Sequence, residues 1–236
     1  MWNQKVEYKS SAWSYTPLKY WPNTTDEKIS FFAYAPYADT QNTASSSNGI
    51  ELTAATASGY PKITFHWNTT TPSAGVDLVA TNAAQTGGDK TVDLTKQTAA
   101  VPFKFKHVLS RANFWAKLDG SVNDSETKVF IKGIKLLGTG ASTPAVANSS
   151  SKFYTKATYK WEDGTWDYTA GTKQAAAVDL DGGILNKTTQ SFGSGNVYTT
   201  SSVAVTATAA SMFKATQYLF LIPPAQWLSP ILLPLT

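Results

Sequence analysis

Short alternating segments separated by turn-forming residues constrain this chain more than any other feature. Apolar and polar residues alternate in Lys62–Trp67 and in Val101–Leu109. Such two-residue alternation places side chains on opposite faces of an extended strand. Sustained helical periodicity is scarce, and only Lys173–Val178 and Ala207–Phe213 are candidates for short helices. The sequence therefore predicts an all-β protein.

Further strands are expected where alternating or β-branched residues lie between Gly, Pro, Asn, Asp or Ser clusters. These segments are Lys28–Tyr34, Ile50–Thr53, Asp77–Ala80, Ala112–Leu118, Val129–Leu137, Lys152–Trp161, Thr165–Tyr168, Val197–Ala209 and Tyr218–Ile222. Asp163–Gly164 predicts a hairpin turn between two of them. Val101–Leu109 and Ala112–Leu118 are expected to pair with each other, with Phe103, Phe105 and His107 on the inward face.

Composition excludes several classes of protein. With 42% hydrophobic and 15% charged residues, the 236-residue chain is too apolar for a disordered protein and too weakly charged for a coiled coil. The net charge is +4, but all basic residues except Arg111 are lysines, spread from Lys5 to Lys214. Nucleic-acid binding normally uses clustered basic residues and bidentate Arg contacts, so nucleic acid is not an expected partner.

Residues that carry chemistry are few. The chain has no Cys and two His, so no disulfide, metal site or cofactor is expected. His107, Ser110 and a carboxylate such as Asp119 could form a catalytic triad, but a packed His107 on a strand face is the favoured interpretation. Acidic neighbours such as Glu162 and Asp163 are typical of turns. The sequence therefore predicts neither catalytic residues nor an enzyme.

Aromatic side chains concentrate at Trp161, Trp166 and Tyr168. They are the candidate sugar-stacking residues, since exposed aromatic rings can stack on sugars. Cross-strand packing within a hairpin is the alternative, and it is favoured because aromatic pairs commonly stabilise sheets.

Domain organisation is suggested by one segment that is poor in charge. Gly138–Ser151 is rich in Gly, Ala, Ser and Thr and is the best candidate for a linker. It divides the chain into an N-terminal β-sandwich over residues 1–140 and a C-terminal one over residues 141–236. A long surface loop within one larger sandwich is the alternative.

Several segments together resemble the fimbrillin-like pilus subunits of Bacteroidales bacteria. They are Trp13, Tyr15–Pro22, Ile29–Pro36, Val101–Ser110 and Leu219–Pro223. The resemblance is strongest over residues 13–137. It implies two transthyretin-like, Greek-key β-sandwich domains and no enzymatic activity, and the C-terminal domain is expected to be truncated.

The resemblance also implies a function. The expected protein is a lipoprotein precursor, exported to the outer membrane, that becomes a structural subunit or adhesin of a cell-surface fimbria. Its expected partners are other pilus subunits, joined by strand exchange, and surface glycans or proteins of a host or of other bacteria. The alternative function is a secreted carbohydrate-binding β-sandwich protein.

The two ends of the chain depart from the family pattern. No signal segment or lipobox cysteine precedes Trp2, so a processed subunit or a fragment is expected. The apolar stretch Tyr218–Leu235 contains four prolines. It is interpreted as an aggregation-prone fragment end, with a donor strand as the less favoured alternative because Pro cannot donate ladder hydrogen bonds.

Overall fold

The structure is a computed structural model of the whole chain. It describes residues 2–24, 26–38, 49–55, 59–122, 129, 131, 133–136, 154–173, 178–180, 184–185, 190–192, 198–200 and 205–223. The expected linker Gly138–Ser151 and the terminal residues 224–236 lie outside this part.

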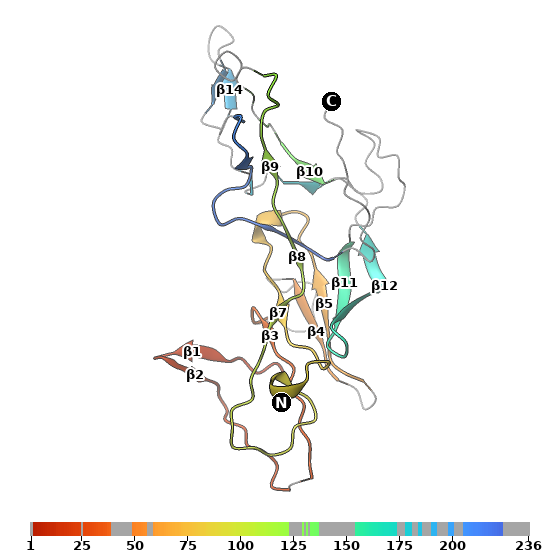
Figure 1. The fold of residues 1–236 in the computed structure, drawn as a ribbon. Helices are drawn as coiled ribbons and strands as arrows, with labels where there is room; N and C mark the ends of the chain where they lie inside the picture. Colours follow the sequence, from red (N-terminus) through yellow and green to blue (C-terminus); the bar gives the residue numbers. More distant parts are fainter. Residues whose placement is uncertain are drawn as a thin grey trace.

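The regular secondary structure of the described residues is almost entirely β-strand, which confirms the all-β prediction (Figure 1). The strands are β1 (Glu7–Lys9), β2 (Ala12–Ser14), β3 (Tyr34–Ala35), β4 (Ile50–Thr53), β5 (Lys62–His66), β6 (Val79–Ala80), β7 (Lys106–His107), β8 (Ser110–Ala112), β9 (Trp115–Ala116), β10 (Lys135–Leu136), β11 (Tyr154–Lys160), β12 (Thr165–Lys173), β13 (Val178–Asp179), β14 (Gln190–Phe192), β15 (Tyr198–Thr200), β16 (Ala210–Ser211) and β17 (Leu219–Leu221). Two single-turn 3-10 helices, η1 (Pro72–Ala74) and η2 (Gly87–Asp89), accompany them. Within these residues, no helix has the length and apolar character that crossing a bilayer requires.

The largest sheet has the strand order β12-β11-β5-β4, with all neighbours antiparallel. The hairpin predicted at Asp163–Gly164 joins β11 to β12, and Gly164 has a φ of +74°, which suits glycine. The buried apolar residues of this sheet include Ile63 and Phe65 of β5 and Ala157 and Tyr159 of β11. The sheet therefore contributes one apolar face to the main core.

This sheet bears on the domain prediction. Strand β11 pairs with β5 from Lys156↔His66 to Lys160↔Lys62, so the sheet joins residues on both sides of position 140. The division into 1–140 and 141–236 stays a prediction. A first domain that also contains β11 and β12 would fit this pairing better.

The remaining strands form smaller antiparallel sheets, ordered β3-β6-β7, β1-β2, β8-β17, β9-β16, β10-β13 and β14-β15. Figure 1 shows β9, β10 and β14 at one end of the molecule, while the β1-β2 hairpin projects sideways near the other end. The strands predicted over Ile50–Thr53, Asp77–Ala80 and Tyr218–Ile222 are confirmed as β4, β6 and β17.

The hairpin predicted between Val101–Leu109 and Ala112–Leu118 is wrong. Strand β7 pairs with β6, β8 pairs with β17 and β9 pairs with β16. Local alternation indicates a strand but does not identify its partner, and here each partner is distant in the sequence.

The predicted inward face of Val101–Leu109 is also wrong. Phe103 and Phe105 are 42% and 44% exposed, and the His107 side chain is 73% exposed. Val108 and Leu109 are buried instead. Residues 101–105 are not in a strand, so side-chain alternation over this segment does not follow one sheet.

The helix expected at Ala207–Phe213 is wrong as well, because this segment contains β16. Lys173–Val178 is not helical at its described ends, where Lys173 ends β12 and Val178 begins β13. The strand expected over Lys28–Tyr34 is shorter than predicted. Only a bridge between Ile29 and Leu94 and the strand β3 form there.

Candidate functional site

Two of the three candidate triad residues, His107 and Asp119, have other hydrogen-bond partners. The His107 ring lies beside Asp77, with Nδ1 2.9 Å from Oδ1, on the surface. Asp119 instead accepts hydrogen bonds from Ser121, whose backbone N–H and hydroxyl lower the pKa of the Asp119 carboxyl. No group of three His, Cys, Asp or Glu side chains that could hold a metal ion is found within the described residues.

The candidate sugar-stacking residues are used in packing. Trp161 is 2% exposed, so its ring lies inside the core. The half-buried Trp166 donates its indole N–H to the Val108 carbonyl at 2.9 Å, and Tyr168 donates its hydroxyl to the Pro223 carbonyl at 2.7 Å. This placement favours the packing interpretation over sugar stacking. Sugar binding by these residues stays a prediction.

Two exposed aromatic side chains, Tyr8 and Trp13, lie on the β1-β2 hairpin, for which the sequence analysis predicts no element. Strands β1 and β2 pair from Glu7↔Ser14 to Lys9↔Ala12. We call residues 5–14 the N-terminal ribbon. The alternation that could have indicated it is visible in Lys5–Lys9, where Val6 and Tyr8 separate three charged residues.

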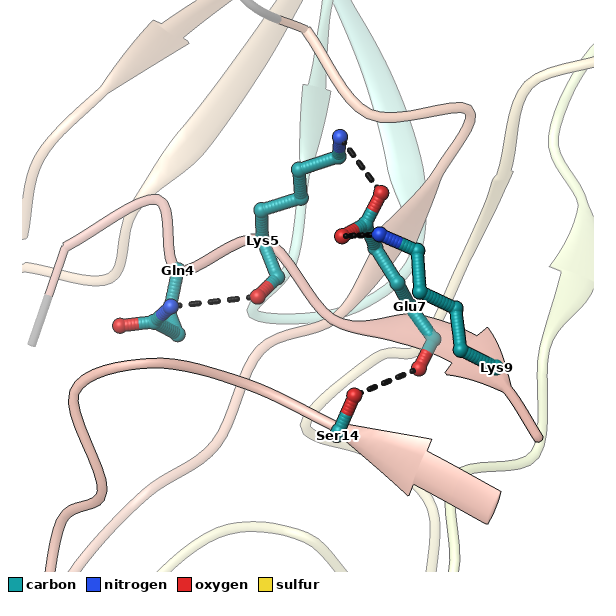
Figure 2. Close-up of polar contacts among 5 residues, drawn as sticks. All are labelled: Gln4, Lys5, Glu7, Lys9 and Ser14. Carbon is teal, nitrogen blue, oxygen red and sulfur yellow. Dashed lines mark hydrogen bonds and ion pairs between the residues drawn. The ribbon is translucent and has the colours of Figure 1, made fainter. Parts of the chain in front are cut away.

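One face of the N-terminal ribbon is charged (Figure 2). Glu7 bridges Lys5 and Lys9, with its two carboxylate oxygens 2.7 and 2.9 Å from the ammonium nitrogens. Hydrogen bonds from these two lysines lower the pKa of Glu7 to about 2. Ser14 lies on the same face and donates its hydroxyl to the Glu7 carbonyl at 3.4 Å. The carboxylate is thus ionised at neutral pH and offsets one of the two positive charges.

The opposite face of the ribbon is apolar and exposed. Tyr8 and Trp13 are direct cross-strand partners, and their ring centroids lie 5.1 Å apart. Val6, Tyr8 and Trp13 are 49%, 59% and 72% exposed. None of the three packs against the main hydrophobic core. An antiparallel sheet normally turns such a face toward a core, but no described part of the chain covers this face.

The root of the ribbon is fixed to the body of the molecule by three hydrogen bonds. Asn3 donates its side-chain amide to the Ala38 carbonyl at 2.9 Å, and the Tyr34 hydroxyl donates to the Asn3 side-chain oxygen at 2.5 Å. The Ala38 N–H completes the set by donating to the Tyr34 hydroxyl oxygen at 3.1 Å. Burial raises the pKa of Tyr34, so the hydroxyl keeps its proton. The ribbon is therefore anchored at its root and projects at its tip.

The edge of the largest sheet is a second exposed feature. Strand β12 has β11 as its neighbour on one side, and no described strand lies on the other. The Asp167 side chain accepts the Thr169 N–H at 2.9 Å, which lowers the pKa of Asp167 and occupies a main-chain donor of this strand. A side chain that takes an edge donor in this way hinders the addition of another strand there.

These features define an all-β scaffold whose exposed elements are sheet edges and an aromatic ribbon. The sequence model of the fimbrillin-like family matches residues 1–224. The chain is similar to the fimbrium subunit Fim1C of Phocaeicola vulgatus, with 33% identity over 228 residues, which is 94% of this chain and 55% of that protein. It is also similar to a fimbrial protein from Bacteroides vulgatus of known crystal structure, with 31% identity and a TM-score of 0.73, covering 95% of this chain and 63% of that one.

The chain belongs to the fimbrillin-like family. This confirms the resemblance drawn from the sequence. The chain spans about half the length of the curated relative it matches. Both of these relatives are fimbrial proteins.

Proposed function

We propose that this chain is a structural subunit of a cell-surface fimbria and joins its neighbours by strand exchange. The match to the fimbrillin-like family over residues 1–224 carries the proposal. The proposed location is the outer surface of the bacterium, attached through the outer membrane, and the proposed partners are other pilus subunits.

The sheet architecture is compatible with strand exchange. The described sheets contain two to four strands, so each has edge strands with a described strand on one side only. Such edges accept an added strand through ladder hydrogen bonds, while alternating side-chain pockets select the sequence of that strand. Because Asp167 occupies a donor of β12, we expect the added strand to pair at another edge.

The proposal is tested on surface material from the source bacterium. An antibody against this chain is used to probe unboiled and boiled samples on denaturing gels, with a strain lacking the gene as control. We expect a ladder in the unboiled sample that collapses to one band on boiling, because strand-exchanged sheets resist the detergent. A single band in both samples would refute strand exchange. Immunogold electron microscopy then shows whether the chain lies along a filament or at its tip.

We also propose that the fimbria mediates adhesion. The fimbria is proposed to contact surface glycans or proteins, and loss of cell attachment in the deletion strain, restored by the intact gene, is the expected result. Attachment that does not change on deletion would contradict this role.

A further inference from the structure

The apolar face of the N-terminal ribbon is left exposed by the described residues of its own chain. Val6, Tyr8 and Trp13 share this face, and each is about half exposed or more. An isolated two-stranded hairpin is marginally stable in water and normally needs a third strand or a packed face. The turn at its tip lowers the stability of the hairpin further, because Ser10 and Ser11 have positive φ values of 51° and 62°. The ribbon is thus an element whose stability would rise if its apolar face were covered.

We propose that the apolar face of the N-terminal ribbon binds the same face of a second copy of this chain, forming a two-fold dimer. This contact is separate from strand exchange, since it joins side chains and not main-chain edges. A two-fold interface is the commonest form of self-association, and it uses the same patch on both copies.

The size of the face fits a small dimer. A fully exposed Tyr or Trp offers roughly 200 Å², so the observed exposures leave about 260 Å² on Tyr8 and Trp13 together. Val6 and the rim of the ribbon bring the total to roughly 500 Å² on each copy, given that somewhat over half of an interface is apolar. Two such faces bury about 1,000 Å², which is the lower limit for a specific interface. We therefore expect a weak, reversible dimer.

The placement of charge also fits pairing between identical faces. Lys5, Glu7 and Lys9 lie on the opposite side of the ribbon, where Glu7 bridges both lysines. In a face-to-face dimer, these charges point away from the second copy and stay in water. Like charges therefore do not oppose each other across the contact, and no charged group has to be buried.

The anchored root makes the ribbon suitable for such a contact. The hydrogen bonds among Asn3, Tyr34 and Ala38 hold the base of the ribbon. A surface that is already positioned loses less conformational entropy when it binds.

The test uses the full chain in solution. Sedimentation equilibrium over a range of concentrations is expected to show a monomer–dimer equilibrium for the unmodified chain. Trp13→Ser should shift this equilibrium to monomer, at least tenfold in dissociation constant. The matched control is Trp115→Ser, since Trp115 is 64% exposed on another sheet and should leave the equilibrium unchanged. Circular dichroism confirms that both variants are folded.

A second measurement does not depend on removing an aromatic residue. Because the chain has no cysteine, Val6→Cys places one thiol on the apolar face and Ser14→Cys places one on the charged face. Alkylation of Val6→Cys should slow severalfold as the protein is concentrated, while alkylation of Ser14→Cys should not. If concentration changes the alkylation rates of the two thiols equally, the face-to-face arrangement is overturned.

The outcomes separate this proposal from strand exchange and from other occupants of the face. A chain that stays monomeric at every concentration overturns the proposal. If that monomer sediments with vesicles of phosphatidylethanolamine and phosphatidylglycerol, the face belongs to a lipid surface. A Trp13→Ser variant that loses the dimer but keeps the detergent-resistant ladder supports both proposals, since the ladder reports strand exchange alone.

Discussion

Replacing Gly164 with Ala should destabilise the protein strongly, because two separate costs meet at this residue. Gly164 ends the turn between β11 and β12 with a φ of +74°. An L-residue in this left-handed region costs about 1–2 kcal/mol. The new Cβ would also lie 2.7 Å from the Asn82 side-chain nitrogen and 3.2 Å from its Cγ.

The clash at Asn82 is difficult to relieve. Asn82 is 8% exposed, and the buried Tyr159 holds the adjacent backbone by donating its hydroxyl to the Thr81 carbonyl at 3.3 Å. Forcing extra atoms into such a packed site typically costs about 1–3 kcal/mol. The two terms together predict a loss of about 2–5 kcal/mol in the free energy of unfolding.

Two other glycines provide matched controls. Gly87 has a similar φ of +62°, but a Cβ there would meet no atom within 4 Å. Gly87→Ala should therefore show only the backbone cost of about 1–2 kcal/mol. Gly88 has equally open surroundings and no positive φ, so Gly88→Ala should change stability by less than about 0.5 kcal/mol.

The assay is urea unfolding of the four proteins, monitored by tryptophan fluorescence. The free energy of unfolding should fall in the order Gly88→Ala, Gly87→Ala, Gly164→Ala. Equal losses for Gly164→Ala and Gly87→Ala would show that the contact with Asn82 contributes nothing. That result would refute the packing of this turn against Asn82.

Three further predictions concern the hairpin formed by β11 and β12. Trp166→Phe keeps an aromatic ring but leaves the Val108 carbonyl without its 2.9 Å donor, so urea unfolding should show a loss of about 1–2 kcal/mol, and an unchanged midpoint would contradict this bond. Hydrogen bonds from Lys160 and Thr165 lower the pKa of Asp163 to about 2, from an ordinary value of 3.8. The stabilisation from Asp163 is therefore present above about pH 4 and is lost as the pH falls toward 2. The unfolding midpoint of Asp163→Asn should vary less with pH across this window than the midpoint of the unmodified chain. Parallel curves for the two proteins would contradict the lowered pKa of Asp163. On a glycan array, Trp166→Ala should bind as the unmodified chain does if this aromatic set serves packing, and a binding signal that vanishes in the folded variant would support sugar stacking.

The sequence predicts local features of this fold well. Asp163–Gly164 carries its own turn chemistry, so the β11–β12 hairpin follows from adjacent residues. Lys62–Trp67 alternates and is bounded by Pro and Asn, and it forms β5. In both cases, the information lies within a few residues.

The same reasoning fails where the partner of a strand is distant. The pattern of Val101–Leu109 is regular, but only β7 forms within it, and its partner β6 is selected by the tertiary fold. Phe103 and Phe105 precede β7, lie outside any strand and are exposed, although their spacing predicts burial.

The N-terminal ribbon is a second case in which a local pattern does not predict the tertiary surroundings. The alternation in Lys5–Lys9 indicates a two-faced strand, but the sequence does not reveal that its apolar face stays uncovered. That face has the pattern of a buried one, and only the structure shows that no core residue reaches it. For Trp161, Trp166 and Tyr168, the sequence favours cross-strand packing over sugar stacking, and the structure places these side chains in packing contacts.

The pairing of β8 with β17 has a consequence for synthesis of the chain. Ala112 cannot pair with Leu219 until Leu219 has been synthesised, roughly 100 residues later. At typical rates of elongation, the edge of β8 is without its partner for about 5–20 s. During this time, β8 can pair with strands of other nascent chains. A cell that makes this protein in quantity therefore benefits from a chaperone that shields residues 110–112 until the last described strand emerges.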